Sequence, residues 1–381
     1  MKKSIKEKIK SFIDRQVSSG PDWYLIGGIW LLVGLGLAIL ASATVVVGWQ
    51  RGDTYFFLKN QLTRGVLPGF LIFWFFYWFD YRRLEKMAMW MLFVSIGLLV
   101  LVFVPGIGAS WGTSNSWISI FGFSLQPSEV VKLTFLIYLA ALLCRKEKEH
   151  LKDFNYGFIP FFLILGIVAG LMFLEPDTGT MMILVVMSIA VFFVAGGSLW
   201  HISWMGGLGV VGIWLMMKLS PYRAARLTTF LYPELDPRGI GYHINQALLA
   251  VGSGGWLGRG YGHSRQKFAY LPEVAGDSIF AVTAEELGFF LSSVIIMIYV
   301  FIALRGLKLA SKVEDQFGRL LVVGIITWFS FQALVNIGAI MGVMPLTGIP
   351  LPFISYGGTA MFSSLAATGI LANISRQTKN T

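Results

Sequence analysis

The chain enters one of its apolar segments through Leu271-Pro272-Glu273-Val274-Ala275-Gly276-Asp277-Ser278-Ile279-Phe280 and then Glu285-Glu286-Leu287-Gly288. Charge is costly at the entrance to a bilayer, so these four acids favour a functional site. The alternative is a set of water-facing residues at a helix end. A helix over the 27 residues 278–304 is about 40 Å long, which exceeds a hydrocarbon core of about 30 Å. We therefore expect its first two turns to lie outside the lipid or to line a wet cavity, with Asp277 at the boundary.

The composition places the chain among polytopic membrane proteins. Hydrophobic residues make up 56% of the 381 residues and charged residues only 13%, whereas a soluble domain has about 25% charged residues. The formal net charge is +10, and basic residues crowd the first segment, which is typical of the cytoplasmic side of a membrane. Without basic repeats interleaved with aromatic residues, nucleic acid is not expected as a partner. The one cysteine, Cys144, excludes a disulfide framework within one chain.

Apolar runs of about 20 residues predict transmembrane helices. Lysine and arginine residues gather in alternate connections, which places both termini in the cytoplasm. The first run imitates a signal peptide but is long enough to cross a bilayer, so we interpret it as an uncleaved helix. Ten segments qualify, at 22–48, 61–79, 87–104, 128–144, 157–174, 178–196, 200–219, 278–304, 319–344 and 356–374.

We therefore predict an all-α integral membrane protein of about ten transmembrane helices. The chain is expected to form a single polytopic domain over 1–381, with a basic cytoplasmic tail at 1–21. Its one long extracytoplasmic loop, at 220–277, lies between the seventh and eighth helices. Aromatic residues in this loop predict an ordered segment at the membrane surface, with short amphipathic helices at 222–232 and 242–251.

A glycine-rich run over 252–262 lies within this loop. It is compatible with a phosphate cradle but lacks the preceding strand and following helix of a nucleotide-binding fold. Glycines also let backbone approach a large substrate closely. Arg259, Arg265 and Lys267 supply positive charge nearby. Both His243 and His263 lack metal-ligand spacing, and we interpret them as solvated loop residues.

Polar residues also open the fourth predicted span, at Gln126-Pro127-Ser128-Glu129 with Lys132 three residues later. The i,i+3 spacing puts Glu129 and Lys132 on one helix face. A lysine one turn inside a span must be paired, reach outward or face a polar cavity. Two interpretations remain open: a point charge that holds a phosphate, and a structural ion pair at the helix mouth.

Two further segments have irregular composition. Glu175-Pro176-Asp177-Thr178-Gly179 joins two spans by a tight turn, and its acids either cap the next helix, which we favour, or bind a cation. In the segment 345–358, three prolines within eight residues exclude a continuous helix. Irregular backbone near a membrane is tolerated only inside protein or beside water, so this segment is expected to line the same cavity as Asp277. On the preceding span, Gln332 and Asn336 are interpreted as residues that form hydrogen bonds between helices.

Together these motifs resemble the SEDS family (shape, elongation, division and sporulation), the peptidoglycan polymerases that include FtsW and RodA. The resemblance covers nearly the whole chain, and seven motifs in order make it specific. They are Gln126-Pro127-Ser128-Glu129 with Lys132, Glu175-Pro176-Asp177-Thr178-Gly179, Gly252-Ser253-Gly254-Gly255, Gln266-Lys267, Leu271-Pro272-Glu273 with Asp277, Ala284-Glu285-Glu286-Leu287-Gly288, and Gly348-Ile349-Pro350-Leu351-Pro352-Phe353-Ile354-Ser355-Tyr356-Gly357-Gly358.

The resemblance implies ten transmembrane helices in a bacterial cytoplasmic membrane and a processive glycosyltransferase that acts on lipid II outside it. It places the catalytic aspartate at Asp277 and the essential lysine of the fourth span at Lys132. It implies as partner a single-span class B penicillin-binding transpeptidase, together with other membrane proteins of the divisome or elongasome. The residues expected to contact substrate are Lys132, Glu129, Gln246, Arg259, Lys267, Glu273 and Ser355.

The chain departs from the family pattern at three positions. Gly276 and Ser278 flank Asp277 where the family usually has threonine and phenylalanine. Ser116 precedes Trp117-Ile118 where it often has an arginine. The last change removes one expected phosphate contact, which Arg223, Arg226 or Arg259 is a candidate to replace. The pattern favours the division type over the elongation type.

The expected chemistry is proton abstraction by Asp277 from the 4-hydroxyl of an acceptor sugar that attacks the donor's anomeric carbon. The lipid pyrophosphate leaves, and one-step displacement predicts inversion. Positive charge for the leaving group would come from Lys132, the loop arginines or a divalent cation, Mg or Mn; no other cofactor is expected. One alternative is a lipid II flippase, which would also need wet cavities beside broken helices. The other is a divisome scaffold that catalyses no reaction.

Overall fold

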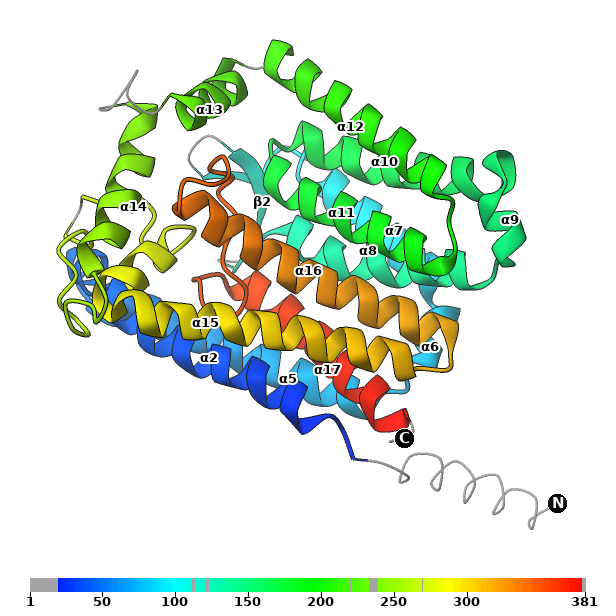
Figure 1. Ribbon diagram of the computed structural model, residues 1–381, viewed down its shortest axis with the longest axis horizontal. Coiled ribbons are helices and arrows are strands. Elements are labelled where there is room, and N and C mark those ends of the chain that lie inside the picture. Colours follow the sequence, from blue (N-terminus) through cyan, green and yellow to red (C-terminus); the bar gives the residue numbers. More distant parts are fainter. Residues whose placement is uncertain are drawn as a thin grey trace.

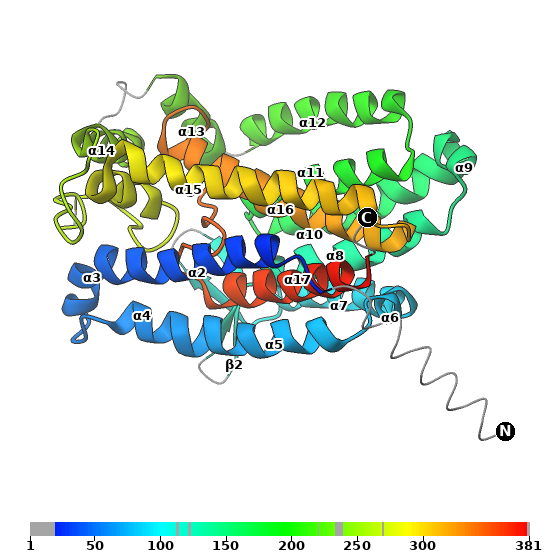
Figure 2. The same ribbon diagram turned by 60° about the horizontal axis from the view of Figure 1, so that its bottom comes forward.

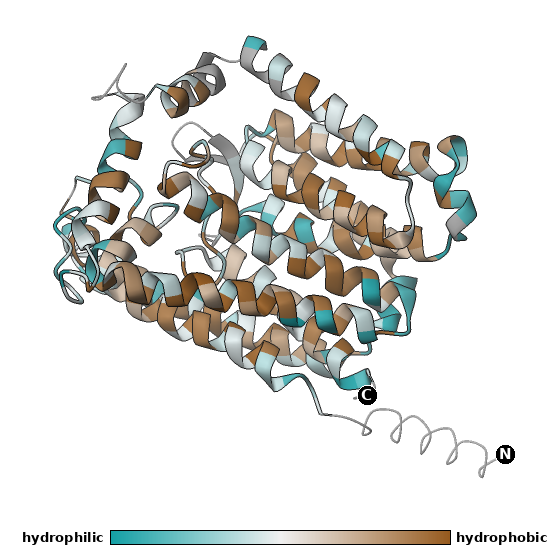
Figure 3. Ribbon diagram, in the orientation of Figure 1, coloured by the Kyte–Doolittle hydropathy of each residue, from teal (hydrophilic) through white to brown (hydrophobic). Residues whose placement is uncertain are grey.

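Long helices run side by side through the molecule, as the computed structural model in Figure 1 shows. The structure describes residues 20–111, 114–120, 123–219, 221–232, 239–268 and 270–378. Most of the predicted basic tail at 1–21 lies outside these residues. Figure 3 shows apolar residues along the middle of the helices and hydrophilic residues at their ends, as a bilayer requires.

Each predicted span coincides with helical backbone within the described part of the chain. The first six correspond to α2 (Trp23–Ala43) with α3 (Val45–Gln50), α4 (Phe56–Gln61) with the π-helical η1 (Leu62–Val66) and α5 (Leu67–Trp78), α7 (Ala88–Leu101), α8 (Pro127–Cys144), η2 (Phe154–Phe158) with α10 (Ile159–Leu174), and α11 (Thr178–Ala195). The others correspond to α12 (Leu199–Leu219), α15 (Ile279–Lys312), α16 (Gln316–Ile340) and α17 (Gly358–Gln377), while short helices α6 (Arg82–Lys86) and α9 (Lys148–Lys152) lie in connections.

The all-α membrane class is therefore confirmed. Among the described residues, six helices are long and apolar enough to cross a membrane by themselves, and α7 is a shorter apolar helix. The count of ten crossings and the orientation stay predictions. Both ends of the described chain lie at one end of the bundle, where Asp22 N donates to Ser375 Oγ over 3.1 Å. An even number of crossings requires this arrangement.

Small residues bring the helices together. α17 packs along α5, and α15 packs between α2 and α16 (Figure 2). At the α5–α17 contact, a methyl group on Gly369 would lie 2.5 Å from the carbonyl oxygen of Phe73, so no larger residue fits there. Helix association in lipid depends on such close backbone approach.

A small antiparallel sheet, which the sequence analysis did not predict, occupies the connection between α7 and α8. Strands β1 (Gly108–Trp111), β2 (Ser114–Ile120) and β3 (Phe123–Leu125) are ordered β1-β2-β3. The register pairs Ile118 with both Gly108 and Leu125. This sheet carries the buried Ser116, whose hydroxyl donates to the carbonyl of Glu175 and so joins the connection between α7 and α8 to the one between α10 and α11.

The predicted amphipathic helices of the long loop are confirmed as α13 (Pro221–Leu231) and α14 (Ile240–Gly254). They lie at the end of the bundle opposite the C-terminus (Figure 1). The expectation of a continuous helix over 278–304 is wrong, because Gly288 interrupts α15 with φ 72° and ψ −175°. The backbone N–H groups of Phe289 and Phe290 bond to Gly255 and Trp256 of the loop instead of to their own helix.

Candidate functional site

Asp277 lies in a tight turn just before α15. The carbonyl of Glu273 accepts hydrogen bonds from Gly276 N at 2.9 Å and Ser278 N at 3.3 Å, and Glu273 itself has a positive φ of 49°. The backbone oxygen of Asp277 accepts from Asn336 Nδ2 of α16 at 2.8 Å. Asp277 is half-buried. These bonds fix the backbone at Asp277, while its carboxylate oxygen Oδ1 lies 3.4 Å from Ser278 Oγ.

The proline-rich segment over 345–358 lies against this turn, and the cavity that it was expected to line together with Asp277 stays a prediction. Ser355 Oγ donates to the carbonyl of Gly276 at 2.7 Å and accepts from Leu351 N at 2.8 Å. Tyr356 N donates to the carbonyl of Ala275 at 2.8 Å. Gly348 lies beside the carboxylate, since a methyl group there would lie 3.9 Å from Asp277 Oδ2. The structure thus gives Ser355 a positioning role, and its contact with substrate stays a prediction.

Asn336 and Gln332, one turn apart on α16, connect this turn to the buried lysine. Asn336 Nδ2 also donates to the carbonyl of Ile349 at 2.7 Å, and Gln332 Nε2 to that of Pro350 at 2.7 Å. Lys132 Nζ donates to Gln332 Oε1 at 2.8 Å. The two amides therefore bond to segments outside their own helix, as interpreted, and they join Lys132 to Asp277 through α16.

Lys132 is fully buried, and its ion pair with Glu129 is confirmed at 2.8 Å. Its ammonium also lies 4.6 Å from the centre of the Trp328 ring, which donates in turn to Gln332 Oε1. A buried charge requires such pairing, because removal of one partner leaves an uncompensated ion. Of the two open interpretations, this geometry shows the structural ion pair; substrate contact by Lys132 or Glu129 stays a prediction.

The outer motifs meet at Asp177. Its Oδ1 accepts from Thr180 N at 3.2 Å and caps α11, which confirms the favoured interpretation of this turn. Its Oδ2 accepts from Ser128 Oγ at 2.6 Å and Gln126 Nε2 at 3.1 Å. A methyl group on Gly179 would lie 2.5 Å from the side chain of Ile349, so this turn also touches the proline-rich segment.

Glu285 and Glu286 attach the glycine-rich loop to α15. The carboxylate of Glu285 accepts from Ser264 Oγ at 2.6 Å and Arg265 N at 3.0 Å. That of Glu286 accepts from Ser42 Oγ of α2 and lies 2.9 Å from Lys267 Nζ. The two acids are buried and serve as anchors rather than as groups open to water.

Lys267 and the glycines take part in this attachment. The ammonium of Lys267 is also within 2.7 Å of the carbonyl of Gly262, so the loop folds around it. A methyl group on Gly254 would lie 2.0 Å from Ala284 O, and one on Gly258 would lie 2.2 Å from Glu286 O. These two glycines let loop backbone approach α15, whereas we expected approach to a substrate. Contact between Lys267 and substrate stays a prediction.

The remaining predicted contacts lie around the same loop. The exposed Arg259 donates from Nε to the carbonyl of Ser253 at 3.2 Å, and its Nε lies 3.7 Å from Glu285 Oε1. Gln246 is half-buried on α14, one turn after His243. Their substrate contacts stay predictions. The side chains of Arg223 and Arg226, named as replacements for the missing arginine, lie outside the described part of the structure.

The interpretation of His243 as a solvated loop residue is wrong. It is half-buried on α14, and its Nε2 lies 2.6 Å from Ser278 Oγ, which lies 3.4 Å from Asp277 Oδ1. Ser278, one of the departures from the family pattern, is therefore the link between His243 and Asp277. At Gly276, the other departure, an added methyl group meets only ordinary contacts with Glu273. Sequence alone had no signal for this link, since it joins residues 35 positions apart.

Glu273 and Asp277 form a pair of acids at the mouth of the site. Partial burial, followed by the negative charge of Asp277, raises the pKa of Glu273, while His243 and Arg51 lower it. Arg51 is thus a cation near the acids that we did not expect to be functional. A signal existed, because Arg51 is one of few basic residues in the predicted outer connections.

The described residues contain no group of three or more His, Cys, Asp or Glu side chains that could hold a metal ion. Mg²⁺ is often bound by one or two carboxylates together with substrate phosphates, however. Glu273 and Asp277 are two neighbouring carboxylates, since the charge of Asp277 raises the pKa of Glu273. The donor set therefore fits a cation that a pyrophosphate substrate helps to bind.

Residues 23–380 match the family model described as FTSW_RODA_SPOVE, cell cycle protein. The chain is 40% identical over 368 residues to the Stage V sporulation protein E of Bacillus subtilis, covering 95% of this chain and 98% of that protein. It is 37% identical to a probable peptidoglycan glycosyltransferase FtsW of Trichlorobacter lovleyi, covering 93% of each.

Solved structures agree with this relationship. A chain from a peptidoglycan synthase complex superposes on this chain with a TM-score of 0.77. That complex is described as one that coordinates polymerization and crosslinking. The two chains are 27% identical, and the match covers 93% of this chain and 98% of that one. The family model, the two relatives and this superposition all extend over nearly the whole chain. The chain therefore belongs to the FtsW/RodA/SpoVE family.

Proposed function

We propose that this protein is a peptidoglycan glycosyltransferase that polymerises lipid II at the outer face of the bacterial cytoplasmic membrane, with Asp277 as general base. Membership of the family and the names of the FtsW relatives support the activity. The observation that best supports Asp277 as the base is the hydrogen bond from Asn336 Nδ2 to the backbone carbonyl of Asp277. This bond fixes the backbone of Asp277 relative to α16. A general base must be positioned within reach of the proton that it accepts.

In the proposed step, the 4-hydroxyl of the acceptor sugar attacks the anomeric carbon of the donor and its proton passes to Asp277. The new C–O bond forms as the bond between the anomeric carbon and the lipid pyrophosphate breaks, with inversion. Glu273, whose pKa is raised, holds its proton to higher pH than an ordinary glutamate. In this proposal Asp277 is the base, and Glu273 is the neighbouring acid expected to contact substrate.

Charge on the leaving pyrophosphate requires positive groups near the outer end of the bundle. Arg51 is close enough to Glu273 to lower its pKa and is our first candidate. A divalent cation, Mg or Mn, held by an ionised Glu273 and the substrate pyrophosphate would supply Lewis-acid stabilisation there, while the Asp277 carboxylate accepts the proton. Lys132 is buried and acts indirectly. It donates to Gln332, which in turn donates to the carbonyl of Pro350 in the proline-rich segment. Direct contact between Lys132 and phosphate would require α8 and α16 to separate.

We also propose a class B penicillin-binding transpeptidase as partner. The similar solved chain belongs to a complex that coordinates polymerization with crosslinking. A single-span partner needs an apolar helix face, and the segment of α15 after Gly288 exposes Phe289, Phe290 and Leu291. Division is the cellular process that we favour over elongation.

The test is polymerisation of purified lipid II by the full chain with its transpeptidase partner, with and without Mg²⁺ or Mn²⁺. Asp277→Asn should abolish glycan chains, because the amide cannot accept the proton. Asp53→Asn is the matched control: its carboxylate lies on the outer connection after α3 and pairs with Lys59. Full activity of Asp277→Asn would reject the role of Asp277. Lipid II scrambling by the chain alone in liposomes, without polymer, would instead favour the flippase.

A further inference from the structure

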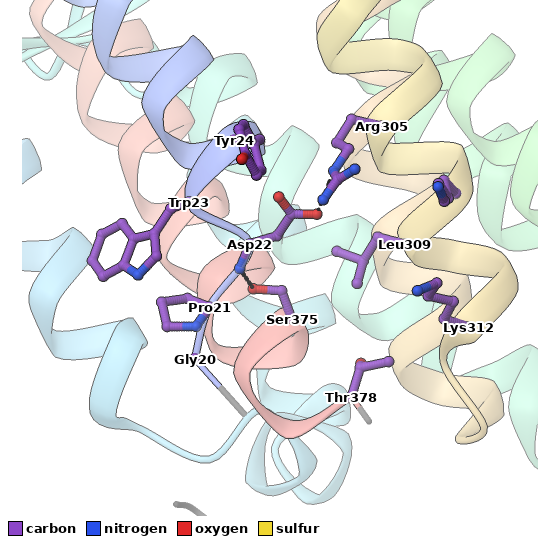
Figure 4. Close-up of a pocket in the computed structure, with 11 residues that line it drawn as sticks. Gly20, Pro21, Asp22, Trp23, Tyr24, Arg305, Leu309, Lys312, Ser375 and Thr378 are labelled. Carbon is purple, nitrogen blue, oxygen red and sulfur yellow. Dashed lines mark hydrogen bonds and ion pairs between the residues drawn. The ribbon is translucent and has the colours of Figure 1, made fainter. Parts of the chain in front are cut away.

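A hollow of about 250 Å³ lies at the other end of the bundle from Asp277. It is enclosed by the start of α2 and the last turns of α15 and α17, so three segments far apart in sequence meet there (Figure 4). Its polar and aromatic lining includes Asp22, Tyr24, Arg305, Lys308, Lys312 and Ser375.

Its positive charge comes from one face of α15. Arg305, Lys308 and Lys312 follow one another at intervals of three and four residues, which places them on the same side of a helix. They begin directly after Leu304, where the apolar part of α15 ends. The hollow is therefore at the level where a membrane-spanning helix leaves the hydrocarbon.

Arg305 is held in a fixed position. Its Nε lies 2.7 Å from Asp22 Oδ2, and its guanidinium lies 5.2 Å from the centre of the Tyr24 ring. Asp22 also caps α2 by accepting from Leu25 N at 3.2 Å. The lining contains three cations and one acid, so its formal charge is positive. This positive charge fits an anion.

The surroundings fit a lipid more closely than a soluble anion. Trp23 and Tyr24 are 61% and 72% exposed, as aromatic residues are at a membrane interface. Leu304, one residue before Arg305, is 64% exposed and offers an apolar surface to an acyl chain. The hollow is smaller than the ~300–1,000 Å³ of pockets that enclose a whole small molecule, so it takes a head group and leaves the chains in the bilayer.

We propose that this hollow binds the phosphate of an anionic glycerophospholipid from the adjoining leaflet. Basic pockets between transmembrane helices recognise lipid head groups through this chemistry. The phosphate accepts hydrogen bonds from the lysines and neutralises the excess charge of α15. Bound there, it joins the end of α15 to the beginning of α2 and the end of α17.

The experiment measures binding of short-chain phosphatidylglycerol, short-chain phosphatidylcholine and inorganic phosphate to the purified full chain in neutral detergent, by thermal shift and titration. The test variant is Lys308→Gln with Lys312→Gln. The matched control is Lys86→Gln with Lys152→Gln, which removes two exposed charges at the same end of the bundle but outside the hollow. Each juxtamembrane charge contributes about 1 kcal/mol, which corresponds to about a fivefold change in affinity.

We expect phosphatidylglycerol to bind more tightly than phosphatidylcholine, the test variant to lose about fivefold per lysine, and the control to lose less than twofold. Equal binding of the two lipids by the native chain would overturn the proposal, and this comparison does not depend on the folding of any variant. Equal losses in test and control would show diffuse attraction without a site. Inorganic phosphate that stabilises as well as phosphatidylglycerol would make the site one for a soluble anion, which also rejects the lipid.

Discussion

His243 Nε2 lies 2.6 Å from the hydroxyl of Ser278, the residue that directly follows Asp277. The same hydroxyl lies 3.4 Å from Asp277 Oδ1, so one serine joins a helix of the long loop to the acid at the start of α15. Ser278 is fully buried, which makes the link independent of solvent. The orientation of the carboxylate therefore depends on the folding of a loop that the sequence places far from it.

The first prediction concerns this link. Ser278→Ala and His243→Gln should each lower kcat for lipid II polymerisation by about fivefold to tenfold, as expected for loss of one hydrogen bond of about 1 kcal/mol. KM should change little, because neither residue need touch substrate. Ser253→Ala removes a hydroxyl that bonds only to Ala250 within α14 and is the control. Unchanged kcat in both test variants would mean that Asp277 is oriented without His243.

The second prediction concerns Asn336. Asn336→Leu leaves the carbonyls of Asp277 and Ile349 without this donor, and each unsatisfied buried group costs about 1–3 kcal/mol. We expect a lower melting temperature and at least a tenfold loss of polymerisation. Asn373→Leu is the control, since Asn373 makes a similar bond to the carbonyl of Tyr77 at the other end of the bundle. If the two variants lose stability and activity equally, Asn336 has no special role in positioning Asp277.

The third prediction concerns the buried pair of Lys267 and Glu286. Lys267→Met or Glu286→Gln should each destabilise the fold by about 3–5 kcal/mol, because each leaves an unpaired partner in a buried place. The double variant should be more stable than the sum of the two single losses implies. Denaturation of all four proteins gives the coupling energy directly. Additive losses would show that Lys267 is not bound to Glu286 and would return it to the set of substrate contacts.

The exposed pair of Lys59 and Asp53, 2.7 Å apart, is the reference for this experiment. Its side chains are open to water, so Lys59→Met should leave the melting temperature unchanged. This contrast separates the effect of burial from the effect of ion pairing itself.

The fourth prediction concerns pH. Burial and the charge of Asp177 raise the pKa of Glu175 to about 8. Among the described residues, neither of its carboxylate oxygens has a hydrogen-bond partner. In the unfolded chain this acid ionises near pH 4.5, so between about pH 4.5 and 8 the folded state holds one more proton than the unfolded state. The contribution of Glu175 to stability therefore falls as pH rises through this range.

Glu175→Gln removes this dependence. Its melting temperature should exceed that of the native protein at pH 9 by more than it does at pH 5. Measurement at pH 5, 7 and 9 in one buffer system tests the sign. A constant difference across the range would mean that Glu175 is ionised in the fold at neutral pH.

Much of the architecture follows from local sequence. Apolar runs of sufficient length must form helices in lipid, because every backbone polar group needs a partner there. α13 and α14 correspond to the short amphipathic helices that the aromatic residues of the long loop predicted at the membrane surface. The ion pair of Glu129 and Lys132 follows from spacing on one helix, and the cap at Asp177 follows from turn chemistry.

Other features depend on contacts that no local pattern specifies. The break at Gly288 exists because loop backbone at Gly255 and Trp256 supplies carbonyl partners for Phe289 and Phe290. Without that loop, the same residues would favour an unbroken helix. The strands between α7 and α8 likewise depend on pairing between residues across turns rather than on strong apolar alternation.

The sequence by itself determined the class of protein, the helices and the identity of Asp277 as the candidate base, because hydrophobic length, helix spacing and family motifs are all written along the chain. The tertiary structure alone decided what surrounds that base: the amide of Asn336, the hydroxyl of Ser355 and the pair of Ser278 and His243. The physical reason is that a hydrogen bond depends on distance and direction in space. Residues 35, 59 and 79 positions apart acquire these only when the helices pack.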